Sequence, residues 1–216
     1  MSPANPLLVP STLPYGLPDF SAIRDEHVMP ALEEALRRHT AEIAAIADSP
    51  EEPTAANTVV ALEQSGQDLA RVLGYFYTVA GADATEERLR MEAEISPLLA
   101  QHSDDMYMNP QLFHRIDAVF QTLPESVGSI EAKGGVTAAQ LEAETVALAQ
   151  RYHDLFLRHG AGLSAEAQAR VREINAELSQ LSSEFGDNLL KDTQARAVHI
   201  MEECKLAGVD LSLIHI

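Results

Sequence analysis

Apolar residues recur at steps of three and four along most of this chain, which is the period of an amphipathic helix. The pattern predicts a first helix with Pro30 in its first turn, ended by SPEEP at 49–53. Its apolar row contains Val28, Leu32, Leu36, Ile43 and Ile46. A second helix is expected from a cap at Thr54 or Asn57 to Gly81. A third is expected over about 85–108, kinked or split by Pro97.

The second half of the chain continues in the same way. Asn109-Pro110 begins a fourth predicted helix, and the segment PESVGSIEAKGG follows it as a flexible connection. TAAQ at 137–140 is typical of a capping box and begins a fifth helix, which Gly160 closes. Ser164 caps the last helix, whose apolar row we expect in the core: Val171, Ile174, Leu178, Leu181, Phe185 and Leu189. AVHIM at 197–201 alternates and predicts a short strand.

These elements predict an all-α fold, an antiparallel helical domain over residues 23–210. Prolines at 3, 6, 10, 14 and 18 block helix and sheet pairing, so residues 1–22 are predicted to form an extended arm. The last six residues, LSLIHI, form an uncharged β-type segment that folded proteins bury or avoid. We therefore interpret residues 211–216 as a non-native tail.

The net charge of the chain limits the classes of molecule that it is expected to bind. With 33 acidic and 15 basic residues the net charge is −18, which repels phosphate backbones and argues against nucleic acid as a partner. We find no signal peptide and no stretch of transmembrane length, so the expected location is cytoplasmic, with no membrane partner. The single cysteine, Cys204, excludes an internal disulfide and a cysteine-rich zinc site.

A search for catalytic groups finds no complete site. None of the eight histidines is followed by Glu, so the helical zinc motif H-E-x-x-H is absent, and His153 and His159 lie on different faces of one helix. DEH at 25–27 and SDDMY at 103–107 bring carboxylates together, but they are better explained as helix-start and solvated residues. Cys204 lacks the surroundings of a nucleophile. The sequence therefore predicts no catalytic, cofactor-binding or metal-binding residue in this chain.

Several long segments, in order, resemble one family. NPLLVPSTLPYGLPDFSAIRDEHVMPALEEAL, AEIAAIADSPEEPTAANTVVALEQSGQDLARV and LFHRIDAVF are similar to the start of the bacterial peptidyl-dipeptidases of the M3 zinc metallopeptidase family. RHGAGLSAEAQARVREINAELSQLSSEFGDNLL and KLAGVDL continue the resemblance, which extends to about residue 210. The chain departs from the family at Ala55-Ala56, where Phe-Glu is usual, and the missing Phe is expected to weaken packing at that helix start.

The resemblance implies a function for a longer protein. The peptidyl-dipeptidases of the family release dipeptides from the C-termini of short peptides, and the zinc ligands and catalytic residues of the family lie far downstream of this region. The resemblance thus implies an inactive N-terminal lobe that binds no zinc and that self-associates through its exposed interface. The alternative is a free-standing, non-catalytic helical module that binds a peptide or a partner helix. The choice between dipeptidase and endo-oligopeptidase activity stays open here.

Overall fold

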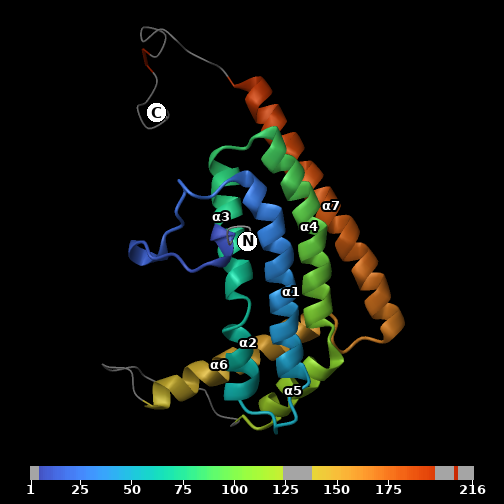
Figure 1. Cartoon of the computed structure of the whole chain (residues 1–216). Coiled ribbons are helices and arrows are strands. Elements are labelled where there is room, and N and C mark those ends of the chain that lie inside the picture. Colours follow the sequence, from blue (N-terminus) through green and yellow to red (C-terminus); the bar gives the residue numbers. More distant parts are fainter. Residues whose placement is uncertain (1–4, 124–137, 198–206, 209–216) are drawn as a thin grey trace.

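The computed structural model describes residues 5–123, 138–197 and 207–208, with the backbone alone for 138–142 (Figure 1). No strand occurs among these residues, and the predicted all-α fold is confirmed. Most of the predicted strand at 197–201 and the whole of the predicted tail at 211–216 lie outside the described residues. The same holds for the whole of the connection PESVGSIEAKGG.

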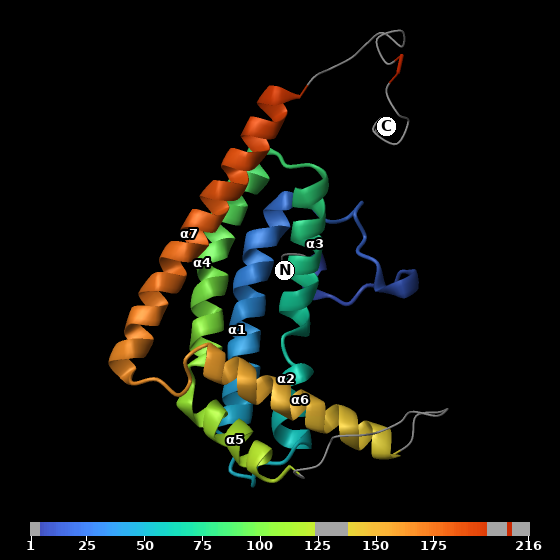
Figure 2. The ribbon, with the colours of Figure 1, turned by 180° about the vertical axis from the view of Figure 1, so that it is seen from behind.

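Three long helices stand side by side, and two others close one end of them. The upright helices are α1 (Val28–Ala47), α3 (Gln67–Ala82) and α4 (Glu86–Tyr107). α5 (Pro110–Gln121) and α6 (Ala138–Arg158) lie across the lower end, beside the short α2 (Ala61–Glu63). α7 (Ala165–Arg196) runs back along the outside of α4, as both views show (Figure 2). α7 thus forms the edge of the helical layer.

α1 passes through two separate cores. Its first half contributes Val28, Leu32 and Ala35 to a cluster with α3, Leu7 of the arm and Ile95 of α4. Its second half contributes Ile43, Ile46 and Ala47 to a cluster of residues from the lower elements: Val59, Leu62, Leu112, Ile116, Val119, Ala149 and Phe156. The predicted apolar row of α1 is therefore buried, except that Leu36 is partly exposed. Burial of this row along both cores is what makes α1 the central helix.

Helix caps occur where the sequence places them. The Asn109 side chain accepts hydrogen bonds from the backbone N–H groups of Gln111 and Leu112, both at 3.0 Å, and Pro110 takes the first helical position of α5. The Ser164 hydroxyl accepts from the N–H of Ala167 at 3.3 Å at the start of α7. These predictions depend only on neighbouring residues, and they are confirmed.

The predicted single helix over 54–81 is wrong. A π-helical turn, η4 (Ala56–Val60), and α2 precede α3, and the chain breaks at Gly66, whose φ is +70°. The Gly66 N–H donates to the Glu42 carboxylate of α1 at 2.7 Å, which holds this left-handed turn in place. Of the two alternatives expected at Pro97, a kink or a split, the split is wrong, because α4 continues through Pro97. Its packing between α1 and α7 offsets the hydrogen bond that Pro97 cannot make.

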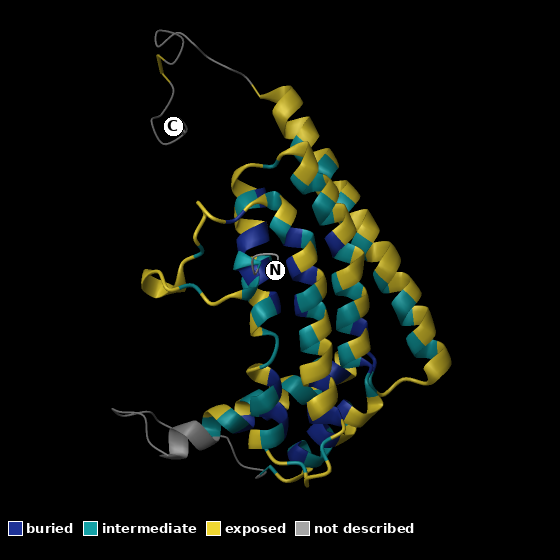
Figure 3. Cartoon of the chain, in the orientation of Figure 1, coloured by how far each residue is buried: buried dark blue, intermediate teal, exposed yellow. Residues whose placement is uncertain are grey.

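The prediction that the apolar row of α7 belongs to the core is wrong as well. No residue of α7 is buried, and Leu178 and Phe185 are 54% and 70% exposed (Figure 3). α7 instead meets α4 through polar contacts: Arg172 with Asp105, Asn175 with Asp104, and Ser183 with Ser96. The helix forms as predicted, but its apolar face points away from the helix that it packs against.

Candidate functional site

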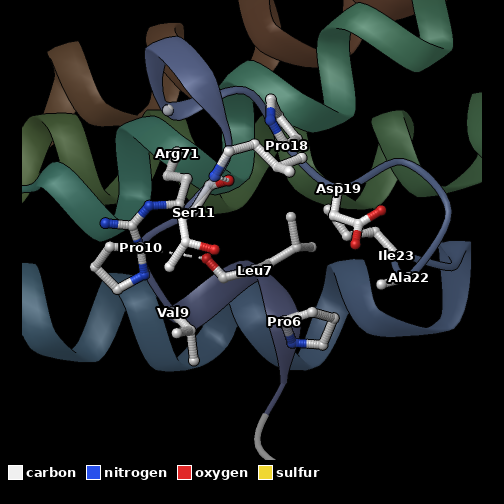
Figure 4. Close-up of a pocket in the computed structure, with 13 residues that line it drawn as sticks. Pro6, Leu7, Val9, Pro10, Ser11, Pro18, Asp19, Ala22, Ile23 and Arg71 are labelled. Atoms are coloured by element: carbon white, nitrogen blue, oxygen red, sulfur yellow. Dashed lines mark hydrogen bonds between the residues drawn. The ribbon is translucent and has the colours of Figure 1, made fainter.

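The N-terminal arm encloses a cavity of about 380 Å³ against the helices (Figure 4). Leu7, the buried residue of the short helix η1 (Pro6–Leu8), lines this cavity together with the apolar side chains of Val9 and Ile23. Arg71 lies at one end of the cavity and Asp19 at the other. The lining offers apolar surface and two charges, which suits the binding of a ligand.

Two hydrogen bonds fix the root of the arm. The Asn5 amide donates to the carbonyl of His27 at 2.8 Å, and Asn5 Oδ1 accepts from the N–H of Leu7 at 3.0 Å. Arg71 donates to Asp68 at 2.8 Å and to the carbonyl of Leu7 at 3.4 Å, so it ties the arm to α3. Further out the arm projects into solvent, and Tyr15, at φ +60°, is fully exposed. The predicted extended arm is therefore anchored at residues 5–7 and interrupted by short turns.

A pair of histidines joins α1, α4 and the turn before α3. His39 Nδ1 lies 2.9 Å from His102 Nε2, and His39 Nε2 lies 3.1 Å from the Ser65 hydroxyl. Since Ser65 donates its own proton to the carbonyl of Leu62 at 2.7 Å, it accepts from His39 Nε2–H. His39 Nδ1 is then an acceptor, and His102 donates to it through Nε2–H. In this arrangement His39 carries its proton on Nε2 alone and is neutral.

The surroundings of the histidine pair favour the neutral state. Burial lowers the pKa of His39 and that of His102 below the ordinary value, and for His39 the neighbouring His102 lowers it further. Glu42 and Asp105 act in the opposite direction, on His39 and His102 respectively. Sequence reasoning missed this pair, because the two residues are far apart in the chain and share no motif. Two imidazoles without a nearby third ligand do not make a zinc site.

The carboxylates singled out from the sequence do not form an acid–base pair. Asp25 binds Arg88 at 3.1 Å at the start of α1, as a helix-start residue does. Asp105 is paired with Arg172 at 2.7 Å and is largely exposed. The expectation that Asp104 is solvated is wrong: its residue is 5% exposed, and Oδ1 accepts from Asn175 of α7 at 2.7 Å. Asp104 thus helps to attach α7.

His153 of α6 and His159, the residue that follows this helix, lie in different surroundings. His153 stacks on Phe120, with ring centres 3.9 Å apart, and its Nε2 lies 3.2 Å from Asp117. His159 stacks on Tyr107 at 4.1 Å, and its Nδ1 lies 2.7 Å from the carbonyl of Leu155. Both rings contribute to packing between α4, α5 and α6. Cys204 lies outside the described residues.

A buried arginine was also missed by sequence reasoning. Arg115 of α5 is 5% exposed and donates to the carbonyls of Ser49 and Glu51, at 3.0 and 2.8 Å, and to Asn57 at 3.2 Å. Its Nε has no hydrogen-bond partner among the described residues. Arg115 therefore holds the connection between α1 and η4 in place through hydrogen bonds from the protein interior. This explains how the SPEEP segment is ordered without regular structure.

The described residues do not fit a resident metal. No group of three or more His, Cys, Asp or Glu side chains among them is arranged to hold an ion. No helix in the part of the chain that the structure describes is both long and apolar enough to cross a membrane. What these residues provide is an apolar cavity, a neutral histidine pair and an exposed helix face.

Comparison with known proteins identifies the class. No family model matches the chain. Dipeptidyl carboxypeptidase of Escherichia coli is 36% identical over 209 residues, which are 97% of this chain and 29% of that protein. Dipeptidyl carboxypeptidase of Salmonella typhimurium is 37% identical over 95% of this chain. Oligopeptidase A of Haemophilus influenzae is 28% identical over 99% of this chain.

The predicted resemblance to the M3 peptidases is therefore confirmed, and the match is to an N-terminal portion of such proteins. Within this family the chain is more similar to the dipeptidyl carboxypeptidases than to the oligopeptidases A reported above. It spans less than a third of the length of each of these relatives.

Proposed function

We propose that this chain is the N-terminal helical part of a peptidase that releases C-terminal dipeptides from short peptides. One observation carries the proposal: similarity over 97% of the chain to a protein named dipeptidyl carboxypeptidase, at 36% identity. The match to an oligopeptidase A at 28% identity supports the same broad activity and makes internal cleavage the competing specificity.

In this proposal the chain positions the peptide and does not cleave it. Peptide hydrolysis by a zinc enzyme needs a metal-bound water and a general base. H-E-x-x-H is absent from the sequence, and the described residues offer no cluster for an ion. We therefore assign zinc and the catalytic residues to polypeptide outside residues 1–216, and expect the chain alone to be inactive. The arm (1–22) and the helical domain (23–210) would form one wall of a peptide channel in a cytoplasmic enzyme.

A chimera tests the proposal. This chain replaces the matched 209 residues of the E. coli dipeptidyl carboxypeptidase, and peptides of graded length are analysed by mass spectrometry after incubation. The chimera should release dipeptides from the C-terminus, whereas the chain alone and the E. coli protein lacking its matched region should release none. Cleavage only at internal bonds would replace the dipeptidase proposal with an oligopeptidase. Release of dipeptides by the chain alone would contradict the assignment of the catalytic residues.

A further inference from the structure

α7 presents an apolar row with coiled-coil spacing. Val171, Ile174, Leu178, Leu181 and Phe185 follow one another at steps of three, four, three and four residues. These are the a and d positions of a heptad repeat, which brings a row of side chains against a second helix. Four of the five are among the large apolar side chains that the structure leaves exposed, and Val171 is half-buried. The row is continuous over four turns of the helix.

The apolar row does not face α4, the helix against which α7 packs. α4 is contacted by Arg172, Asn175 and Ser183, all through polar atoms. At 100° per residue, the centre of the apolar row is roughly 130° around the helix from that polar face. α7 therefore has a polar face and an apolar face, and among the described residues only the polar face packs against another helix. A row of this size in water marks an interface.

The geometry points to one kind of partner: an amphipathic helix with its own apolar heptad row, contributed by the part of the peptidase that this chain lacks. This inference rests on the proposed function. The matched region is 29% of the E. coli relative, so most of that protein lies outside it and is available to supply such a helix. Glu177 and Glu184 are exposed along one edge of the row, which favours Lys or Arg at the facing positions of the partner.

A second copy of this chain is a poorer occupant on grounds of charge. The chain carries a net charge of −18, so pairing two copies brings two strongly negative bodies together. A helix from the remainder of the polypeptide belongs to the same molecule. It also gains from being tethered, because linkage raises the effective concentration of the two faces.

Cysteine accessibility tests the inference. Leu178→Cys is introduced in a Cys204→Ser background, and Gln180→Cys, on another side of α7 and also exposed, is the control. Both cysteines should react with a maleimide at similar rates in the chain alone. In the chimera with the E. coli protein, Leu178→Cys should react about tenfold or more slowly, while Gln180→Cys keeps its rate. Equal rates at position 178 with and without the remainder would overturn the inference.

The outcomes separate this inference from the proposed function. A chimera that releases dipeptides while position 178 stays reactive sustains the function and refutes the docking face. A chimera that protects position 178 but releases no dipeptide does the reverse. Protection at position 178 in the chain alone, together with a dimer in sedimentation, would assign the face to a second copy and overturn the proposed partner.

A second arrangement avoids dependence on the chimera. The intact chain is co-expressed with the unmatched remainder of the E. coli protein as a separate polypeptide. The unaltered chain and Gln180→Glu should co-purify with the remainder, and Leu178→Glu should reduce co-purification about tenfold or more, because a charge in the row leaves an unpaired group in the interface. Equal recovery of the two variants, or no recovery with the unaltered chain, would overturn the inference.

Discussion

Replacing Gly66 by Ala should destabilise the domain through a contact that can be separated from backbone strain. Gly66 has φ +70°, a conformation that costs an Ala residue about 1 kcal/mol. A Cβ at this position would also lie 3.0 Å from Cε1 and Nε2 of His39. The ring cannot retreat freely, because its nitrogens bind His102 and Ser65. Displacing it weakens hydrogen bonds of about 1 kcal/mol each, so the expected total is roughly 2–3 kcal/mol.

A double-mutant cycle measures the two parts separately. Gly66→Ala is compared in the unaltered chain and in a His39→Ala background by urea denaturation followed by circular dichroism, at about pH 8 to keep the histidines neutral. The cost should fall to about 1 kcal/mol when His39 is absent, leaving backbone strain alone. Gly74→Ala is the matched control: this α3 glycine has no atom within 4 Å of its added Cβ and should stabilise by roughly 0.5–1 kcal/mol.

Two results would refute this reasoning. If Gly66→Ala leaves the free energy of unfolding unchanged, the left-handed turn is not required for the fold. If Gly66→Ala lowers the free energy of unfolding by the same amount in both backgrounds, the His39 ring does not restrict this position. The packing of the ring against the turn then contributes nothing to stability.

Other predictions follow from burial and charge. Phe156→Ala should lower the free energy of unfolding by about 3–5 kcal/mol, because Phe156 is fully buried. Phe185→Ala on the exposed row should change the free energy of unfolding of the chain alone by less than about 0.5 kcal/mol. Equal losses for the two variants in calorimetry would contradict the exposure of α7. The lowered pKa values of His39 and His102 mean that the unfolded chain binds more protons just below pH 6.5, so stability should be full above that pH and fall as the pH drops through the lowered values. Replacing both histidines by Gln should flatten that acid limb of the stability curve, and an unchanged limb would contradict their neutral pairing. Arg115→Met should lower the free energy of unfolding, measured by urea denaturation, by about 3 kcal/mol, because three hydrogen bonds to residues 49–57 are lost. The same variant should be cleaved faster by proteases within residues 49–57. An unchanged cleavage pattern would show that other contacts hold this segment.

Local signals explain why much of the fold was predictable. Asn109-Pro110 and Ser164 specify helix starts within four residues, and both operate as the sequence indicates. Gly66 was misjudged because a single glycine inside a helical period is tolerated in many helices. Its left-handed turn is selected by Glu42, a residue of another helix, which no local pattern contains.

The candidate site depends on contacts that sequence spacing does not encode. His39 and His102 meet because α1 and α4 pack side by side, and the direction of their hydrogen bond is set by a third residue, Ser65. Asp104 and Asp105 are neighbours in sequence, yet consecutive helical residues point about 100° apart. One is therefore buried against Asn175, while the other is exposed and pairs with Arg172. Burial of a single carboxylate in such a pair requires knowledge of the neighbouring helix.

α7 shows why the period of a helix and the identity of its neighbour are separate problems. The row from Val171 to Phe185 predicts an amphipathic helix equally well whether α4, another domain or another chain covers it. Among the described residues, α4 takes the polar side through Arg172, Asn175 and Ser183, so the apolar side needs a different partner. In our proposal that partner is a helix, because of the heptad spacing, and it belongs to the part of the peptidase that corresponds to the unmatched remainder of the E. coli relative, of which this chain matches 29%. The exposed row on α7 is thus an error of the core prediction and, for the same physical reason, the observation on which the proposed docking of a further helix rests.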